Sequence, residues 1–234
     1  MVKLAKSSAD AAWGEATRAE HRWPASLAVV VAILLYVTLP DRFVLGSHWL
    51  FPVLIAVFLV PLTFLDPKRQ ADDARMLRWA SFGLIALVNA ANIVSLVLLV
   101  HDLLLHGQPT HVQHGQAGKT LISSSIQIWV TNVIVFALWY WELDRGGPGQ
   151  RSTADHREPD FLFPQMANPG CAPKMWAPNF LDYVYVSFTN ATAFSPTDTM
   201  PLTPWSKALM LIQSSASLLT VLLVAARAVN ILGS

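Results

Sequence analysis

The sequence predicts an all-α membrane protein with about five transmembrane helices and a re-entrant, pore-like half-helix before the last of them. Two features of the composition indicate this class. Hydrophobic residues make up 53% of the 234 residues and charged residues only 13%, against roughly 45–50% and 25% in a soluble domain. The net charge of +1 provides no field that would attract nucleic acid. The third observation is a series of apolar stretches close to the roughly 20 residues that a helix needs to cross a membrane.

The first four apolar stretches lie within residues 24–143, which we predict to form four transmembrane helices. They run over residues 27–39, 49–65, 79–105 and 121–141. The first two are short and joined by a tight link, as in a helical hairpin, and the third is the longest. Residues 1–23 precede them as a cytoplasmic tail. This tail has no apolar stretch followed by a small-residue cleavage site, so we do not predict a signal peptide.

Lysine and arginine residues are unevenly distributed between the two sides of this topology. With the N-terminus in the cytoplasm, thirteen of the sixteen lie on the inner side, and the outer side keeps only Arg42, Lys119 and Arg227. An excess of Lys and Arg is typical of cytoplasmic loops. The bias therefore predicts a cytoplasmic N-terminus and an outer C-terminus. Residues 144–179, which are rich in Pro, Gly and charge, then form a polar cytoplasmic loop.

Residues 180–234 combine a polar, interrupted segment with the last apolar stretch, residues 205–232. The first half of the interrupted segment is apolar enough to enter a membrane, whereas the prolines of its second half would end a helix. Non-helical backbone at membrane depth occurs only where protein or a water-filled cavity surrounds it. We therefore predict a half-helix that enters the membrane, turns near Ser195 and returns as an extended strand.

This segment resembles the pore module of potassium channels, a family of tetrameric cation channels. That family has Tyr-x-Ser-Phe, then T-x-G-Y-G-D, then a proline and often Thr-Pro before the inner helix. The matching stretches here are residues 185–188, 192–198 and 200–204, in an ungapped register. The resemblance implies a homo-oligomer, with a tetramer favoured, that conducts inorganic ions. The filter or pore-loop residues that it implies are Thr192, Ala193, Phe194, Ser195, Pro196, Thr197 and Asp198.

The filter-like stretch departs from that family because it lacks the two glycines. Ser195 and Thr197 stand in their places, with Pro196 between them, and proline restricts both its own backbone and that of the preceding residue. We therefore do not expect a cage of backbone carbonyls of the potassium type. Side-chain hydroxyls and the Asp198 carboxylate remain as ligands, and a ring of four Asp198 side chains would favour cations. Alternatively, Asp198 only turns the chain before the last helix.

A polar stripe runs along the last helix. Gln213, Ser217 and Thr220 lie at positions i, i+4 and i+7, on one helical face. In one interpretation they line a pore. In the other they face the fourth helix and bond to Gln127 or Thr131, as polar residues do between membrane helices. The predicted function has two corresponding alternatives. A pore-lining stripe fits a tetrameric, ion-channel-like protein that conducts cations through a non-potassium filter, and a buried stripe fits a non-conducting scaffold or accessory subunit that keeps the pore fold.

Catalytic, cofactor and metal sites are not predicted. The sequence contains no nucleotide-binding, nucleophile-elbow or zinc-protease motif, so we predict no enzyme activity and no cofactor. The single cysteine, Cys171, excludes an intrachain disulfide. Four histidines cluster around the link after the third helix, but the link is rich in Gly and Gln, and we predict a solvated loop without a metal. These histidines are His101, His106, His111 and His114.

From Trp23 onward the chain also resembles a bacterial family of integral membrane proteins of this length with no assigned function. The shared features are the helical hairpin, the charged inner link over residues 66–75 and the aromatic residues 139–141 that end the fourth span. This resemblance implies a location in the bacterial inner membrane, with the lipid bilayer as a partner, and it implies no function.

Overall fold

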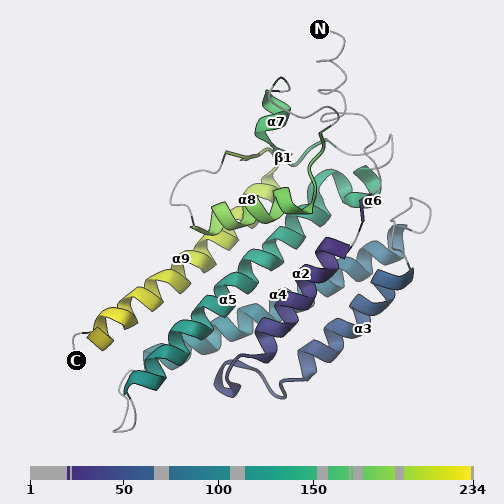
Figure 1. Cartoon of the computed structure of the whole chain (residues 1–234). Coiled ribbons are helices and arrows are strands. Elements are labelled where there is room, and N and C mark those ends of the chain that lie inside the picture. The colour runs from purple at the N-terminus through teal and green to yellow at the C-terminus, as the bar shows by residue number, and fades with distance from the viewer. Residues whose placement is uncertain are drawn as a thin grey trace.

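In a computed structural model the described residues are mostly helical, and the long helices lie side by side in a bundle (Figure 1). The structure describes residues 20–21, 23–65, 74–105, 114–151, 158–168, 170, 176–192 and 198–232. The long helices are α2 (Trp23–Val37), α3 (Leu50–Leu65), α4 (Ala74–Leu105), α5 (His114–Leu143) and α9 (Pro204–Leu232).

Three of the described helices are long and apolar enough to cross a membrane. They contain the candidate spans Arg78–Leu103, Thr120–Gly146 and Pro204–Ala226. The apolar helix α2 has 15 residues, which is less than the roughly 20 that a perpendicular span needs. A short link that contains the 3-10 helix η1 (Asp41–Phe43) joins α2 to α3. These helices agree with the all-α membrane class that the sequence predicted.

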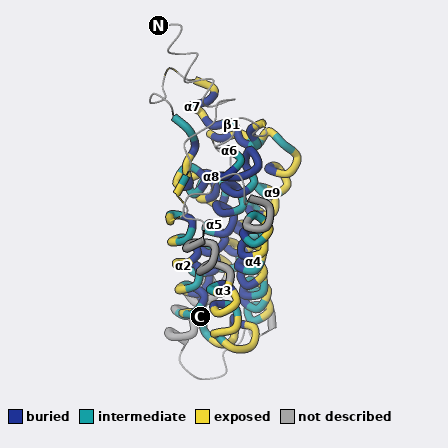
Figure 2. The backbone as a smooth tube through the Cα atoms, turned by 90° about the vertical axis from the view of Figure 1, so that its right-hand side faces the viewer, coloured by how far each residue is buried: buried dark blue, intermediate teal, exposed yellow. Residues whose placement is uncertain are grey.

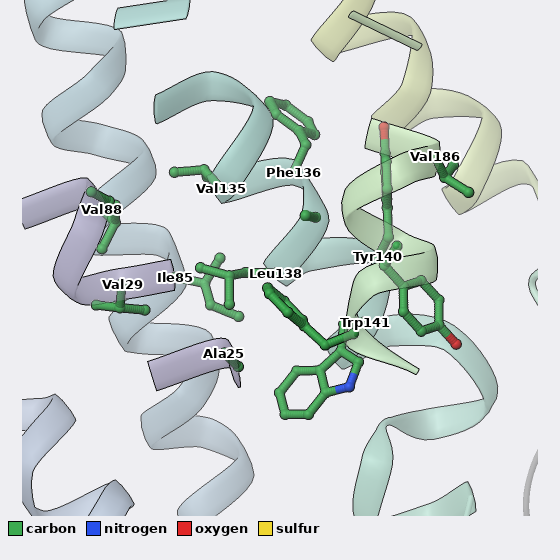
Figure 3. Close-up of a cluster of buried hydrophobic side chains, with 14 of the residues drawn as sticks. Ala25, Val29, Ile85, Val88, Val135, Phe136, Leu138, Tyr140, Trp141 and Val186 are labelled. Carbon is green, nitrogen blue, oxygen red and sulfur yellow. The ribbon is translucent and has the colours of Figure 1, made fainter. Parts of the chain in front are cut away.

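The centre of the bundle is α5, the most buried of the three candidate spans, whereas α9 is the least buried. Figure 3 shows side chains of α2, α4 and α5 meeting in one apolar cluster, with Val29, Ile85 and Leu138 among its buried members. Exposed residues lie on the outward sides of the helices (Figure 2). Large apolar side chains are among them, and Leu34 of α2 and Leu211 of α9 are 60% and 69% exposed. Large exposed apolar surfaces of this kind fit contact with lipid or with other protein.

Short elements close one end of the bundle, which we call the cap. They are η3 (Asp144–Gly146), α6 (Pro148–Arg151), β1 (Phe161–Leu162), α7 (Pro164–Ala167) and β2 (Met200–Pro201). β1 and β2 pair antiparallel, with Phe161 opposite Pro201. The C-terminus lies at the opposite end (Figure 1). The predicted polar loop over residues 144–179 therefore contains short ordered elements, and several of its charged side chains are buried.

The helix α8 (Phe180–Thr192) is short and runs beside α5, starting at the cap. At its beginning, the Phe180 ring contacts the Trp141 ring of α5 at 5.8 Å. Near its end, the Phe188 ring contacts Trp129, twelve residues earlier on α5, at 5.7 Å. Twelve helical residues correspond to about 18 Å, so α8 reaches far along the bundle. By β2 the chain is back at the cap.

The turn between α5 and α6 contains three consecutive residues with positive φ: Arg145, Gly146 and Gly147. Gly147 has φ 95°, and a Cβ atom there would lie 2.8 Å from the backbone oxygen of Glu142. We expect Gly147→Ala to lower the free energy of unfolding by about 1–3 kcal/mol, measured by thermal unfolding in detergent. Gly46→Ala is the matched control, because Gly46 also has positive φ but open space around it. Equal losses in the two variants would contradict the role of the close approach.

Candidate functional site

The polar stripe of α9 lies inside the protomer. Gln213, Ser217 and Thr220 are 0%, 2% and 3% exposed. They are buried because α5 and α8 both pack against this face of α9. The sequence left two interpretations open, a pore lining and a contact with the fourth helix; the structure places all three side chains between helices of one chain. They offer no surface to an axis shared between copies.

Gln213 is the centre of a hydrogen-bond network that joins three helices. Its Oε1 accepts hydrogen bonds from the Tyr140 hydroxyl of α5 at 2.6 Å and from Asn190 Nδ2 of α8 at 2.8 Å. Its Nε2 donates to the Oγ and the backbone oxygen of Ser187 at 2.6 and 3.0 Å. The side-chain amide therefore uses both donors and both acceptor positions. We call Tyr140, Ser187, Asn190 and Gln213 the Gln213 network.

The stripe continues with a second contact to α5. Asn132 Nδ2 donates to Ser217 Oγ at 3.1 Å. The sequence named Gln127 or Thr131 as partners, and this detail was wrong: Gln127 donates to Thr38, the residue after α2, at 3.1 Å, and Thr131 bonds to its own helix. Neighbouring residues on a helix point about 100° apart. The residue after Thr131, Asn132, therefore faces α9, whereas Thr131 does not bond to it.

The outward face of α9 is apolar. Leu211, Leu218 and Leu222 are 69%, 42% and 57% exposed. Ser215 is exposed on this face too, but its hydroxyl donates to the Leu211 backbone oxygen of its own helix at 2.8 Å. Any axis shared between copies along this face would therefore meet mainly leucine side chains.

Of the predicted pore loop, the structure describes the two ends. Thr192 is the last residue of α8, and its Oγ1 donates to the Phe188 backbone oxygen at 2.9 Å. Asp198 is exposed, and Thr199 donates to its Oδ1 at 3.4 Å. The remaining predicted filter residues lie outside the described residues: Ala193, Phe194, Ser195, Pro196 and Thr197.

The structure also covers part of the predicted histidine link. His101 and His114 lie in α4 and α5, whereas His106, His111 and Cys171 lie outside the described residues. Within the described part of the chain, no group of three or more His, Cys, Asp or Glu side chains is placed to hold a metal.

A cluster of buried charges in the cap was not predicted from the sequence. Asp144, Arg145 and Arg151 are 0%, 0% and 1% exposed. Asp144 Oδ2 accepts a hydrogen bond from the Tyr183 hydroxyl at 2.6 Å, and its Oδ1 accepts one from the Asp160 backbone N–H at 2.8 Å. The only signal in the sequence was charge in a Pro- and Gly-rich segment, which is more typical of a solvated loop.

Arg151 connects the end of α5 to Glu20, which precedes α2 in the sequence. Its Nε donates to Glu20 at 3.0 Å, and its Nη1 donates to the backbone oxygens of Trp141 and Asp144 at 2.8 and 3.0 Å. Burial lowers the pKa of Arg151, but the neighbouring Tyr183, Glu20 and Asp144 outweigh this effect and raise the pKa above its usual range. The guanidinium is therefore a permanent buried cation, and its role is electrostatic.

Asp160 connects the cap to α9. Its Oδ1 accepts a hydrogen bond from Thr203 Oγ1 at 2.7 Å, and its Oδ2 accepts one from the Arg145 backbone N–H at 3.2 Å. Thr203 precedes the first residue of α9 and exchanges hydrogen bonds with Ser206, as in a capping box. The start of α9 is therefore fixed to the end of α5.

Together, the Gln213 network and the cap hold α5, α8 and α9 in one arrangement. Both consist of buried and half-buried groups that bond to one another inside the protomer, so their role is to hold these helices in position. A comparison of the chain with protein-family models, with curated proteins and with solved structures found no match.

Proposed function

We propose that this chain is a multi-pass protein of the bacterial inner membrane that acts as a non-conducting scaffold or accessory subunit built around a pore-type module. One observation carries this proposal: the polar stripe of α9 is buried and hydrogen-bonded to α5 and α8 of the same chain. The polar groups that would have wetted a conduction path are used to hold the module together. The remaining free face of α9 is apolar.

The proposed topology has five transmembrane helices, with the cap and the N-terminus in the cytoplasm and α8 as a re-entrant half-helix. The contact of Phe188 with Trp129 and the return of the chain to the cap at β2 support the re-entrant path. A hydroxyl group also satisfies a backbone carbonyl in the last turn of α8, because Ser214 Oγ donates to the Asn190 backbone oxygen at 3.3 Å. This substitutes for water, which is absent from the hydrocarbon core.

We also propose that the chain forms homo-oligomers, with a tetramer favoured, through the apolar face of α9. One half-helix and one inner helix enclose nothing alone, so about four copies would be needed around an axis. With Leu211, Leu218 and Leu222 toward the axis, that axis would be closed by hydrophobic side chains, which exclude water from narrow pores.

A second candidate function, cation conduction, is favoured by the exposure of Asp198, two residues before β2. At that position, four copies of a carboxylate would concentrate cations at a pore mouth. In this case the ligands would be side chains of the loop and not carbonyls of the potassium type.

Cation flux from proteoliposomes distinguishes the two functions. For the scaffold we expect potassium and sodium efflux equal to that from empty liposomes, at any protein density, because the axis is dry. The second candidate predicts efflux that rises with protein density and falls at least severalfold in Asp198→Asn, because the ring of charge is lost. Efflux that is clearly present but indifferent to Asp198 would contradict both candidates. Lys207→Gln is the matched control for a charge change at the same end of α9.

A further inference from the structure

The hairpin of α2 and α3 is short at both of its helices. α2 has 15 residues and α3 has 16, which correspond to about 22 and 24 Å at the helical rise per residue. The hydrocarbon core of a typical bilayer is about 30 Å thick. Each helix is therefore shorter, by about 6–8 Å, than the layer that it crosses in the proposed topology.

The length of α2 is fixed at both ends. Before it, Glu20 lies outside the helix and is held in the cap, because its carboxylate accepts hydrogen bonds from Trp141 and Arg151. After it, Pro40 has an extended backbone with φ −61° and ψ 147°, and the charged Asp41 follows in η1. The helix therefore gains no further turn without a rearrangement of the cap or of the link.

Both helices of the hairpin present large apolar side chains on their outer surface. Figure 1 shows α2 and α3 together, on the side of the bundle away from α9, and the two helices pack on each other. Their outward side chains are 38–62% exposed: Leu27, Val30, Val31, Leu34, Leu50, Val53, Leu54 and Val57. The hairpin therefore forms one short side of the apolar surface of the protein.

The neighbouring surface of α4 is longer. Its candidate span, Arg78–Leu103, has 26 residues, or about 39 Å. Ile93 and Val97 of this span are 51% and 58% exposed. At the end away from the cap, Arg42 of η1 lies 3.7 Å from the carboxylate of Asp102 of α4, so the link and the end of this span are level. The two surfaces share this end of the bundle and differ in how far they extend toward the cap.

A difference in hydrophobic length changes which lipids fit each surface. A surface that is shorter than the hydrocarbon layer is accommodated by local thinning of the bilayer, at a cost that rises with each ångström of mismatch. Phospholipids with short acyl chains form a thinner layer, so beside the hairpin they avoid this cost. Beside α4 the same lipids would leave apolar side chains uncovered.

We infer that the α2–α3 hairpin is a contact surface for phospholipids with short acyl chains, whereas the exposed face of α4 is matched to longer chains. This inference rests on the proposed membrane topology, but it does not depend on whether the protein conducts ions.

Quenching of a fluorophore by brominated phosphatidylcholine tests this inference on the full chain in liposomes. A single bimane label is attached at Leu34→Cys of α2 or at Ile93→Cys of α4, in a Cys171→Ser background. The two labels lie at a similar depth, because Leu34 is eight residues before Arg42 and Ile93 is nine residues before Asp102. Dimyristoleoyl- and dioleoyl-phosphatidylcholine compete in each sample, and each lipid is brominated in turn.

The ratio of the two lipids at each label is the measured quantity. At Leu34→Cys we expect the shorter chains to be preferred about threefold, because they relieve the mismatch. At Ile93→Cys we expect no preference for the shorter chains. Val53→Cys of α3 should repeat the result for α2, so the comparison does not depend on one labelling site.

The alternative outcomes separate this inference from the topology on which it rests. Equal ratios at Leu34→Cys and Ile93→Cys, or a short-chain preference at Ile93→Cys alone, would overturn the inference and leave the topology intact. Quenching at Ile93→Cys but not at Leu34→Cys or Val53→Cys would show that protein, such as a second copy, covers the hairpin, and this would also overturn the inference. Quenching at none of the three positions would reject the topology itself.

Discussion

Replacing Asp144 with alanine is expected to lower the free energy of unfolding by about 3–5 kcal/mol, the cost of removing one partner from a buried charged group. The Asp144 carboxylate is fully buried and accepts hydrogen bonds from Tyr183 and from the Asp160 backbone. It also lies 3.7 Å from the Nε of Arg145. Without this carboxylate, the buried Arg145 guanidinium loses its neighbouring negative charge and the buried Tyr183 hydroxyl loses its hydrogen-bond acceptor. Unfolding followed by intrinsic fluorescence in detergent measures the loss.

Two variants define the cause of this loss. Asp144→Asn keeps the shape and part of the hydrogen bonding but removes the charge. Its free energy of unfolding should therefore lie between those of the wild type and Asp144→Ala. Asp41→Ala is the surface control, because the Asp41 side chain is 94% exposed and exposed ion pairs contribute about 0–1 kcal/mol. A loss for Asp144→Ala no larger than that for Asp41→Ala would show that the carboxylate does not hold the cap.

Gln213→Leu is expected to lower the free energy of unfolding by about 2–3 kcal/mol, because it leaves buried polar groups unpaired. Tyr140, Asn190 and Ser187 all direct a hydrogen bond to this one side chain or receive one from it. A single interhelical bond in a membrane is worth about 0.6–2 kcal/mol, so a loss of several bonds should exceed the effect of any one of them. Ser215→Ala, on the outward face of the same helix, should change stability by less than about 0.5 kcal/mol.

A double-mutant cycle with Tyr140→Phe separates the network from general packing. If the Tyr140 hydroxyl acts through Gln213, the effect of Tyr140→Phe should largely disappear in the Gln213→Leu background, which gives a coupling of at least about 0.5 kcal/mol. Additive effects of the two substitutions would show that the hydroxyl and the amide do not cooperate. A Gln213→Leu protein as stable as the wild type would contradict the whole network.

Much of the helical framework is predictable from local sequence. The long apolar stretches predicted α4, α5 and α9, because a run of apolar side chains of that length has few stable alternatives to a membrane helix. The predicted starts at residues 79 and 121 were late, since α4 begins at Ala74 and α5 at His114. Pro204 is the first residue of α9, a position where the backbone N–H that proline lacks would have no partner within the helix. The spacing of Gln213, Ser217 and Thr220 likewise predicted one shared face, since that depends only on the helical period.

The sequence by itself therefore determined the class of protein, the long helices and the residues that share a face. Only the tertiary structure decided what that face meets, because the choice between α5, α8 and a shared axis depends on how helices far apart in the chain pack. The same reason applies to the cap. Arg145 and Arg151 belong to a segment that looks solvated. In the fold the Arg145 guanidinium lies beside the Asp144 carboxylate, and Arg151 pairs with Glu20, which comes from a distant part of the chain.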